Sequence, residues 1–321
     1  MARLLGRKLA LIVVLLPLLN AVGFFYAVRF APNAIARQYG RIQRSETPSE
    51  PFLPRYQAYL QGVLAGDWGE VQNTPIPKMV ATPLKNSLIL LLIGFAVTVL
   101  LGPLLGLLAI SQQTGRIGPR AQLLLTAGSA VPGFFLGSLL IALLLFISRS
   151  SLYPWRGPLL PVQGFGIDAH LVLPVLTLAT RPVLYIANVT AGLIEHELQQ
   201  EYVRVALSKG LRWRTALWRH AFPNIVASVT ISAGQSLRML ISGLILAEAL
   251  FDWRGLGRMF LSAIALDERG NRTLYFLEPQ LLALILVCFG AILLLADLIA
   301  SVIAHLADPR LREADRGPAL A

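Results

Sequence analysis

Residues 201 to 224 read Glu201-Tyr-Val-Arg-Val-Ala-Leu-Ser-Lys-Gly-Leu-Arg-Trp-Arg-Thr-Ala-Leu-Trp-Arg-His-Ala-Phe-Pro-Asn224. This polar, strongly basic segment lies between two long apolar runs. Its first part, Glu201 to Lys209, has neither Gly nor Pro and predicts a short helix, which Gly210 can end by adopting a positive φ. We therefore expect a helix-turn-helix elbow outside the bilayer. Together with the end of the preceding apolar run, residues 195–224 are called the elbow below.

The second half of the elbow predicts another helix with one apolar stripe. The residues at spacing i, i+4, i+7 and i+11 are Leu211, Thr215, Trp218 and Phe222. Arg212 and Arg219 share a different face, and Pro223 ends this helix but suits the first turn of the next one. An apolar ridge on a polar loop must be covered by something, so the elbow predicts a docking element.

Composition places the chain among polytopic membrane proteins. Of 321 residues, 55% are hydrophobic and only 14% are charged, and the mean hydropathy is +0.65. Six runs reach the roughly 20 residues that cross a bilayer. They lie near 9–30, 86–112, 121–147, 171–194, 223–250 and 280–306. Because a spanning segment must satisfy its own backbone hydrogen bonds, we predict an all-α membrane protein with about six transmembrane helices.

The first run, within residues 1–30, is interpreted as a retained anchor helix rather than a signal peptide. Its apolar stretch is longer than a usual signal-peptide core, and no convincing small-residue cleavage site follows it. Residues 31–85 then form an expected extracytoplasmic cap. Seven prolines divide this segment into short pieces, and Tyr56, Tyr59 and Val63 mark one amphipathic stretch within it.

Charge distribution predicts that both termini are cytoplasmic. The cluster Arg3, Arg7 and Lys8 precedes the first span without an acidic neighbour, and basic residues are denser in the short segments assigned to the inside. The core is then 86–306, and 307–321 is a cytoplasmic tail. The net charge of +11 is explained by attraction to anionic lipid headgroups rather than to nucleic acid.

Catalytic and metal-binding patterns are missing from the sequence. The single Cys288 lies in the last apolar run, and the four His are scattered without metal-ligand spacing. No nucleophile elbow and no phosphate-binding loop occurs. We therefore predict no catalytic site, no metal site and no cofactor bound by this chain. If its work uses ATP, another chain must bind the nucleotide.

The elbow resembles the cytoplasmic loop of binding-protein-dependent ABC importer permeases, whose pattern is Glu-Ala-Ala, three residues, Gly, nine residues, Ile-x-Leu-Pro. The pattern falls on Arg204-Val205-Ala206, Gly210 and His220-Ala221-Phe222-Pro223, with Arg204 and His220 as departures. The phrase Glu-Tyr-Val-Arg-x-Ala-x-x-Lys-Gly-Leu is similar to the dipeptide, oligopeptide and nickel branch.

Further motifs of that branch follow in order over roughly residues 56–312. They are Tyr59-Leu60, Gly66-Asp67-Trp68-Gly69, Ser129-x-x-Pro132-x-Phe134, Leu160-Pro161-x-x-Gly164, His170-Leu171-x-Leu173-Pro174, Glu248-x-x-Phe251-x-Trp253-x-Gly255-Leu256-Gly257, Asp297-Leu298 and Asp308-Pro309-Arg310-Leu311-Arg312. Departures are Phe30-Ala-Pro-Asn33 in place of a Pro-Gly-Asp-Pro-like turn, Arg254 in place of Pro, and Asn188 and Ala191 where Arg is frequent. The cap motifs resemble the first of the two paired permease subunits.

The resemblance implies a bacterial inner-membrane complex. A second homologous permease would complete the translocation path, two cytoplasmic ATPase subunits would carry ATP and Mg, and an extracytoplasmic binding protein would deliver the solute. Each elbow would insert into a groove of an ATPase. The residues assigned to this coupling are Glu201, Tyr202, Arg204, Ala206, Gly210, Leu211, Arg212, Trp218, Arg219 and Phe222. Apolar anchors would be Leu211, Trp218 and Phe222, with arginines at the rim.

Ionisable residues inside spans are costly and mark candidates for the substrate path. Arg181 and Arg238 could face the path and meet a carboxylate, or could have structural partners inside the bundle. Glu248 resembles the family's gate-region acid but could equally serve helix packing. Asp297 could pair with a basic residue of the elbow or with a lipid-facing cation.

Two other classes of protein remain as alternatives. A secondary transporter or channel would also be helical and basic, but would work without ATP and would more often carry an intramembrane proton relay or broken-helix repeat. A membrane-embedded enzyme would need a nucleophile or ligand set. The resemblance leaves the solute open among dipeptides, longer peptides, nickel complexes and sugars.

Overall fold

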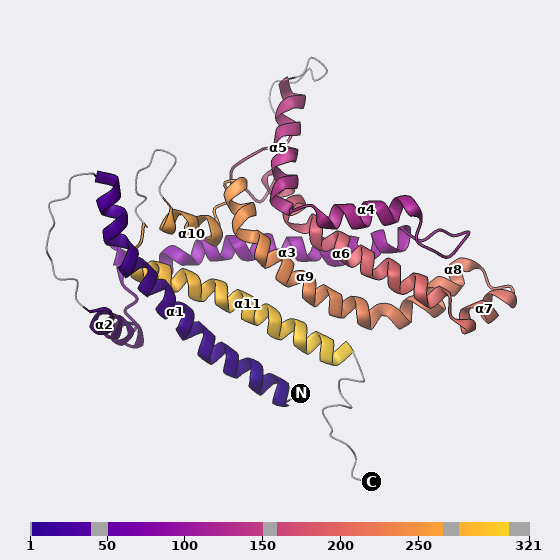
Figure 1. Cartoon of the computed structure of the whole chain (residues 1–321), viewed down its shortest axis with the longest axis horizontal. Coiled ribbons are helices and arrows are strands. Elements are labelled where there is room, and N and C mark those ends of the chain that lie inside the picture. The colour runs from indigo at the N-terminus through magenta and orange to yellow at the C-terminus, as the bar shows by residue number, and fades with distance from the viewer. Residues whose placement is uncertain (1, 40–50, 150–158, 266–275, 308–321) are drawn as a thin grey trace, which may run out of the picture. The chain divides into compact units, whose positions relative to one another are not determined.

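The computed structural model describes residues 2–39, 51–149, 159–265 and 276–307, and most of these residues are helical (Figure 1). The exceptions are connecting segments, one small hairpin and an isolated β-bridge between Ile110 and Ile117. The elements are α1 (Ala2–Tyr39), α2 (Phe52–Leu64), β1 (Glu70–Val71), β2 (Thr74–Pro75), α3 (Ile76–Leu108), α4 (Pro119–Ala130), α5 (Gly133–Arg149), the 3₁₀ turn η1 (Ala169–Leu171), α6 (Val172–Leu198), α7 (Glu201–Ser208), α8 (Trp213–Ala216), the π-helical turn η2 (Leu217–Ala221), α9 (Phe222–Leu250), α10 (Leu256–Ile264) and α11 (Pro279–Ala307). The expected all-α fold class is confirmed.

Five helical segments of the described chain are long and apolar enough to cross a membrane. They are Leu5–Phe30, Ile76–Leu108, Ala169–Leu198, Trp213–Leu250 and Pro279–Ala307. The expected third span, 121–147, is not one straight helix, because α4 and α5 meet at a bend of 101°. Val131 has the extended backbone (ψ 126°) that a residue before proline prefers, and Pro132 has no N–H to continue the helix. The described residues therefore contain six candidate spans only if this bent pair counts as one.

The chain forms two compact units, which are described separately. Among the described residues, the first contains 89–149, 159–253 and 295–307 together with 2–3, and the second contains 4–39, 51–88, 254–265 and 276–294. Helices α3 and α11 contribute residues to both units.

In the first unit, α6 is the central helix, and α4, α5 and α9 pack against it. Helix α3 approaches α6 closely through two glycines one turn apart. A Cβ on Gly102 would lie 2.7 Å from Ile186, and one on Gly106 would lie 2.6 Å from the Ala187 carbonyl oxygen. This small-x-x-x-small spacing lets two backbones meet, which is how helices associate in a membrane where hydrophobic burial gives little driving force.

Replacing Gly106 by valine is expected to destabilise the first unit. The new side chain would meet the Ala187 carbonyl, a backbone atom that cannot rotate away. We expect a loss of about 1–3 kcal/mol, the usual cost of overpacking, measured as a lower melting temperature of the full chain in detergent. Gly94→Ala on the same helix is the control, since its Cβ would lie 3.4 Å from a flexible leucine methyl. Equal melting temperatures for both variants would contradict the proposed contact.

Helix α5 is attached to α6 at its first turns and then leaves it (Figure 1). A Cβ on Gly133 would lie 2.8 Å from the Thr177 carbonyl, and one on Gly137 would meet the Thr177 side chain at 2.8 Å. Further along, α5 is largely uncovered, with Leu143 and Phe146 exposed. The bend after Pro132 thus creates a junction of α4, α5 and α6.

In the second unit, aromatic residues join the expected cap to α1. The Tyr59 ring stacks on Phe24 with centroids 4.9 Å apart, and the Asn20 side-chain amide donates to the Tyr59 hydroxyl at 3.0 Å. The predicted amphipathic stretch is therefore confirmed as part of α2. Helix α10 and the first half of α11 form a second apolar cluster around Leu256, Leu281 and Ile76.

Two expected boundaries differ from the structure or fall outside the described residues. Helix α1 does not end near residue 30 but continues to Tyr39. The stretch after Pro32 contains several good helix formers, and Gly40 is the first glycine after it. The rest of the expected cap at 40–50 and the tail with its Asp308-Pro309 motif lie outside the described ranges.

Candidate functional site

The first half of the elbow forms as predicted. Helix α7 starts at Glu201 and ends at Ser208, and Gly210 adopts φ +85°. The Gly210 N–H donates to the Leu207 carbonyl at 3.0 Å, and the Leu211 N–H donates to the Ala206 carbonyl at 3.3 Å. These two bonds use carbonyls that the helix end would otherwise leave unpaired. The predicted role of Gly210 as a positive-φ terminator is confirmed.

The second half of the elbow differs from the prediction, because its helix does not stop at Pro223. Helix α8 continues through the π turn η2 directly into α9. The Phe222 N–H donates to the Leu217 carbonyl, five residues back instead of four. Pro223 cannot donate to the carbonyl four residues earlier, and a wider turn is a known way to accommodate such a gap. The elbow is therefore mechanically continuous with a spanning helix.

The π turn also changes which side chains face inward. Ala216, Leu217 and Ala221 are buried, whereas Leu211 and Phe222 are only half-buried and Thr215 is exposed. The prediction that Leu211, Thr215, Trp218 and Phe222 form one apolar stripe is therefore wrong, because these four residues differ in exposure. One extra residue in the turn shifts the periodicity after Ala216 away from 3.6.

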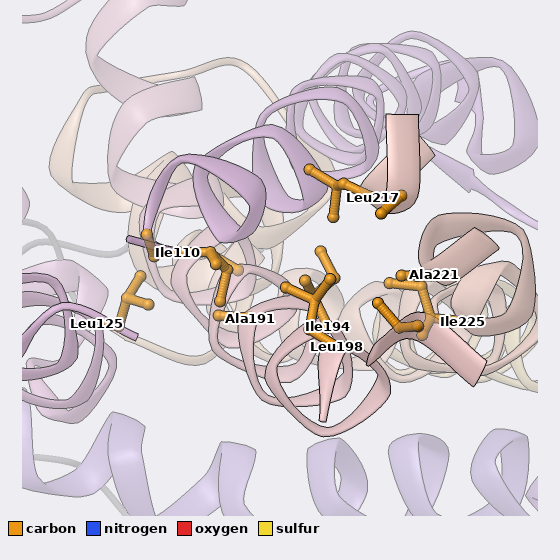
Figure 2. Close-up of a cluster of buried hydrophobic side chains, with 12 residues drawn as sticks. Ile110, Leu125, Ala191, Ile194, Leu198, Leu217, Ala221 and Ile225 are labelled. Carbon is orange, nitrogen blue, oxygen red and sulfur yellow. The ribbon is translucent and has the colours of Figure 1, made fainter. Parts of the chain in front are cut away.

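A hydrophobic cluster fixes the elbow to the end of α6. Leu217 and Ala221 pack with Ile194 and Leu198, and Ile225 of α9 completes the contact (Figure 2). Val203 of α7 is fully buried in the same cluster. Both halves of the elbow therefore rest on one apolar core shared with α6 and α9.

The opposite side of the elbow is exposed, apolar in part and basic. Trp218 leaves 54% of its surface uncovered, although its ring touches that of Phe222 at a centroid distance of 5.0 Å. The exposed apolar side chains also include Val205 and Tyr202. The exposed cations are Arg204, Lys209, Arg212, Arg214 and Arg219. An exposed tryptophan among cations is typical of an interface centre rather than of a solvated loop.

A polar network, which the sequence alone did not indicate, joins the three helices at the base of the elbow. The Tyr202 hydroxyl donates to Glu197 at the end of α6. The Asn224 amide at the start of α9 donates to Glu197 at 2.9 Å and to the Tyr202 oxygen at 2.9 Å. Burial, and then the hydrogen bond to Glu197, raise the pKa of the Tyr202 phenol. The phenol therefore remains a donor at physiological pH.

Replacing Tyr202 by phenylalanine tests whether this network holds the elbow. The hydroxyl is removed while the ring is kept, so we expect a loss of about 1 kcal/mol of stability, seen as a lower melting temperature. In a cycle with Glu197→Gln, the double variant should lose less than the sum of the two single variants, because the residues share one hydrogen bond. Strict additivity would show that the two residues act independently.

The charged residues predicted inside spans have different surroundings. Arg238 of α9 donates from Nη1 to Asp297 Oδ1 of α11 at 3.0 Å. This ion pair favours a structural role for Arg238 over contact with a solute. In this ion pair the partner of Asp297 is a residue of α9 and not a basic residue of the elbow. Glu248 is fully buried, which favours helix packing over contact with a solute. Arg181 is exposed beside Pro182 in the interior of α6.

Several sequence motifs meet at the end of α9 that is far from the elbow. The Gly164 N–H donates to the Phe251 carbonyl at 2.9 Å, and the Phe165 and Trp253 rings lie 4.7 Å apart. Trp253 is fully buried, and its backbone N–H donates to the Glu248 backbone carbonyl at 2.9 Å. Glu248 is thus part of a buried corner where the segment before α6 folds against the end of α9.

Residues 103–313 match the family of binding-protein-dependent transport system inner membrane components. The chain belongs to this family. The permease is 27% identical over 296 residues to a probable peptide ABC transporter permease of Sinorhizobium fredii, with 89% of this chain and 88% of the relative covered. It is 25% identical to the oligopeptide transport system permease protein AppB of Bacillus subtilis, covering 82% and 81%. A putative peptide transport system permease of Brucella abortus is 29% identical, again covering 82% and 81%.

The family match covers the elbow, the bent pair α4–α5 and the three spans that follow. The permease is therefore a multi-pass inner-membrane subunit of an ABC-type, binding-protein-dependent transport system. Its family is the membrane component of such systems and not a catalytic one.

Proposed function

We propose that this permease forms one half of the translocation path of an ATP-driven importer for peptides. The names of the three relatives above support peptides as the solute class. A second homologous permease would complete the path, a soluble binding protein would deliver the solute outside, and two ATPase subunits would bind ATP and Mg. Both termini and the elbow would then lie in the cytoplasm, as the basic N-terminal cluster favours.

The observation that carries the proposal is the two-sided elbow. One side is held by Leu217, Ala221 and Val203 in the core shared with α6 and α9, and the other presents Trp218 among exposed cations. An element that is packed firmly on one side and presents a binding surface on the other can convert the motion of a bound partner into motion of spanning helices. A solvated loop has neither property.

Coupling residues separate into two groups under this proposal. Those that would touch the ATPase have exposed side chains, namely Glu201, Tyr202, Arg204, Arg212, Trp218 and Arg219. Those that would keep the shape of the elbow are Ala206, Gly210, Leu211 and Phe222. Because Arg212 and Arg219 are exposed at the rim, their loss should slow association and raise its salt sensitivity more than it lowers final affinity.

Purification of the tagged permease from its native membrane tests the assembly. We expect a second permease and an ATPase with phosphate-binding loops to be recovered with it. The recovered complex, placed in liposomes with its binding protein, should accumulate a labelled short peptide only when ATP is hydrolysed. Recovery of the permease without an ATPase under mild detergent would contradict the proposal.

The remaining alternative is an ATP-independent secondary transporter. Vanadate, which blocks ATP hydrolysis, should stop uptake by the proposed importer and leave a secondary transporter working. A protonophore at constant ATP should leave uptake by the proposed importer unchanged and stop uptake by a secondary transporter driven by the proton gradient. Uptake that survives vanadate and collapses with the protonophore would favour the alternative.

A further inference from the structure

The bend between α4 and α5 opens a cavity inside the first unit. Its volume is about 220 Å³, and its wall combines the bend itself (Pro132, Gly133 and Phe134) with parts of α6 and α9. Helix α5 turns away by 101° immediately after Pro132, so it does not fill the space beside α6 as a straight span would. The cavity is therefore a consequence of the proline break.

Arg181 is the charged side chain in the cavity wall. No acidic side chain within the described ranges forms an ion pair with it. Arg238, on the neighbouring helix α9, differs because Asp297 holds its guanidinium at 3.0 Å. The Tyr185 hydroxyl of α6 donates a hydrogen bond to the Gln235 side chain of α9. Arg181 lies one helical turn from Tyr185, and Arg238 lies one turn from Gln235, so the two arginines are at a similar level of the paired helices. Of these two arginines, Arg181 is the one whose charge is left for a ligand.

Two irregular points of the backbone border the same cavity. Gly133 and Phe134 open helix α5, where the amides of a first turn have no helical acceptor and attract negative charge. Pro182 lies in the interior of α6 and has no N–H for the Leu178 carbonyl, four residues earlier. Both Leu178 and Pro182 line the cavity. A cation, the first turn of a helix and a carbonyl lacking its usual helical donor therefore belong to residues around one cavity.

The rest of the wall is mainly apolar. Phe134 and Leu246 contribute large exposed side chains, and Met239 is flexible enough to adapt to different shapes. Ser242 is exposed, and its hydroxyl donates to the Met239 carbonyl. The volume is below the roughly 300–1,000 Å³ of pockets that hold whole drug-sized ligands. The cavity therefore suits the end of a molecule rather than an entire peptide.

We infer that this cavity receives the C-terminal residue of a short peptide during its passage, with Arg181 binding the carboxylate. The Leu178 carbonyl would accept from the last amide N–H of the peptide, and Phe134, Met239 and Leu246 would surround its side chain. The inference rests on the proposed function and narrows it to peptides with a free C-terminus. A neutral sugar would make no use of the unpaired guanidinium, and a cationic metal complex would be repelled by it.

Cysteine labelling of the full-length chain tests this directly, because the sequence has a single cysteine. We would replace Cys288 by serine and Ser242 by cysteine, and measure reaction with an anionic sulfonatoethyl and a cationic trimethylammonioethyl methanethiosulfonate. Membrane vesicles of both orientations would be used. The ratio of the anionic rate to the cationic rate should fall about tenfold when Arg181→Gln removes the nearby charge, and Arg181→Lys should keep it.

The matched control is Ser228→Cys in the same background. Ser228 is also exposed on α9 but lies four turns nearer the elbow, outside the cavity wall. Its rate ratio should not change with Arg181→Gln, which separates a local charge effect from a general loss of folding. No reaction at Ser242→Cys, or the same fall in the ratio at both positions, would overturn the inference.

Protection by ligand tests the chemical class. Millimolar leucyl-leucine should slow labelling of Ser242→Cys severalfold, and the same dipeptide with an amidated C-terminus should not. Equal protection by both, or protection by neither, would exclude a carboxylate site. This readout does not need ATP or the partner subunits, so a failed uptake assay with intact protection would reject the importer proposal alone. Intact uptake without protection would reject the cavity inference alone.

Discussion

Gly210→Val is expected to leave the permease in the membrane and to separate ATP hydrolysis from solute uptake. Gly210 has φ +85°, a region that a β-branched residue adopts only with strain of about 1–3 kcal/mol. No atom lies within 4 Å of a Cβ built there, so the strain is purely conformational. The turn would relax to a negative φ, and α7 would leave its position beside the π turn. The measurement is the ratio of peptide transported to ATP hydrolysed in liposomes.

Gly192→Ala is the matched control for that experiment. Gly192 is also exposed and has open space around it, but it lies in the regular helix α6, where alanine is preferred by about 0.5–1 kcal/mol. The control should therefore couple normally. Normal coupling by Gly210→Val would show that the elbow tolerates a changed turn, and the assignment of the elbow as a mechanical element would then be wrong.

The sequence predicts the elements that depend on local rules. Gly210 could be identified because only a residue without a side chain accepts its φ easily, and the apolar runs could be identified because a bilayer requires about 20 residues per helix. Tyr59 could be placed on an amphipathic helix by its spacing with Tyr56 and Val63. These features need no knowledge of distant residues.

The features that the sequence did not predict depend on partners far along the chain or on one irregular turn. Glu197 and Asn224 lie 27 residues apart in sequence, and they are ordinary polar residues until the fold brings both to Tyr202. Trp218 was placed on a common stripe with Leu211, but the π turn between Leu217 and Ala221 changes that alignment. The angle between α4 and α5 is another such feature, because it follows from the extended backbone of Val131 and from the packing of Gly133 and Gly137 on α6.

Leu217 and Trp218 provide the second prediction with a large effect, because these two adjacent side chains differ sharply in exposure. Leu217 is 4% exposed in the core under the elbow, whereas Trp218 is 54% exposed. Trp218→Ala should weaken binding of the ATPase by about 2 kcal/mol or more, roughly 30-fold, as expected for a tryptophan at the centre of an interface. The melting temperature of the isolated permease should fall less than for a buried side chain, since more than half of the Trp218 surface is already exposed.

Leu217→Ala should have the opposite profile. Removing a buried leucine costs about 2–5 kcal/mol of stability, so the melting temperature should fall markedly. The permease molecules that remain folded should still bind the ATPase, because the exposed surface around Trp218 is unchanged. Quantitative copurification of the ATPase, normalised to folded permease, distinguishes the two effects. If Trp218→Ala instead lowered stability and left ATPase binding intact, the exposed side of the elbow would not be the docking surface, and transmission from partner to spanning helices would have to use other residues.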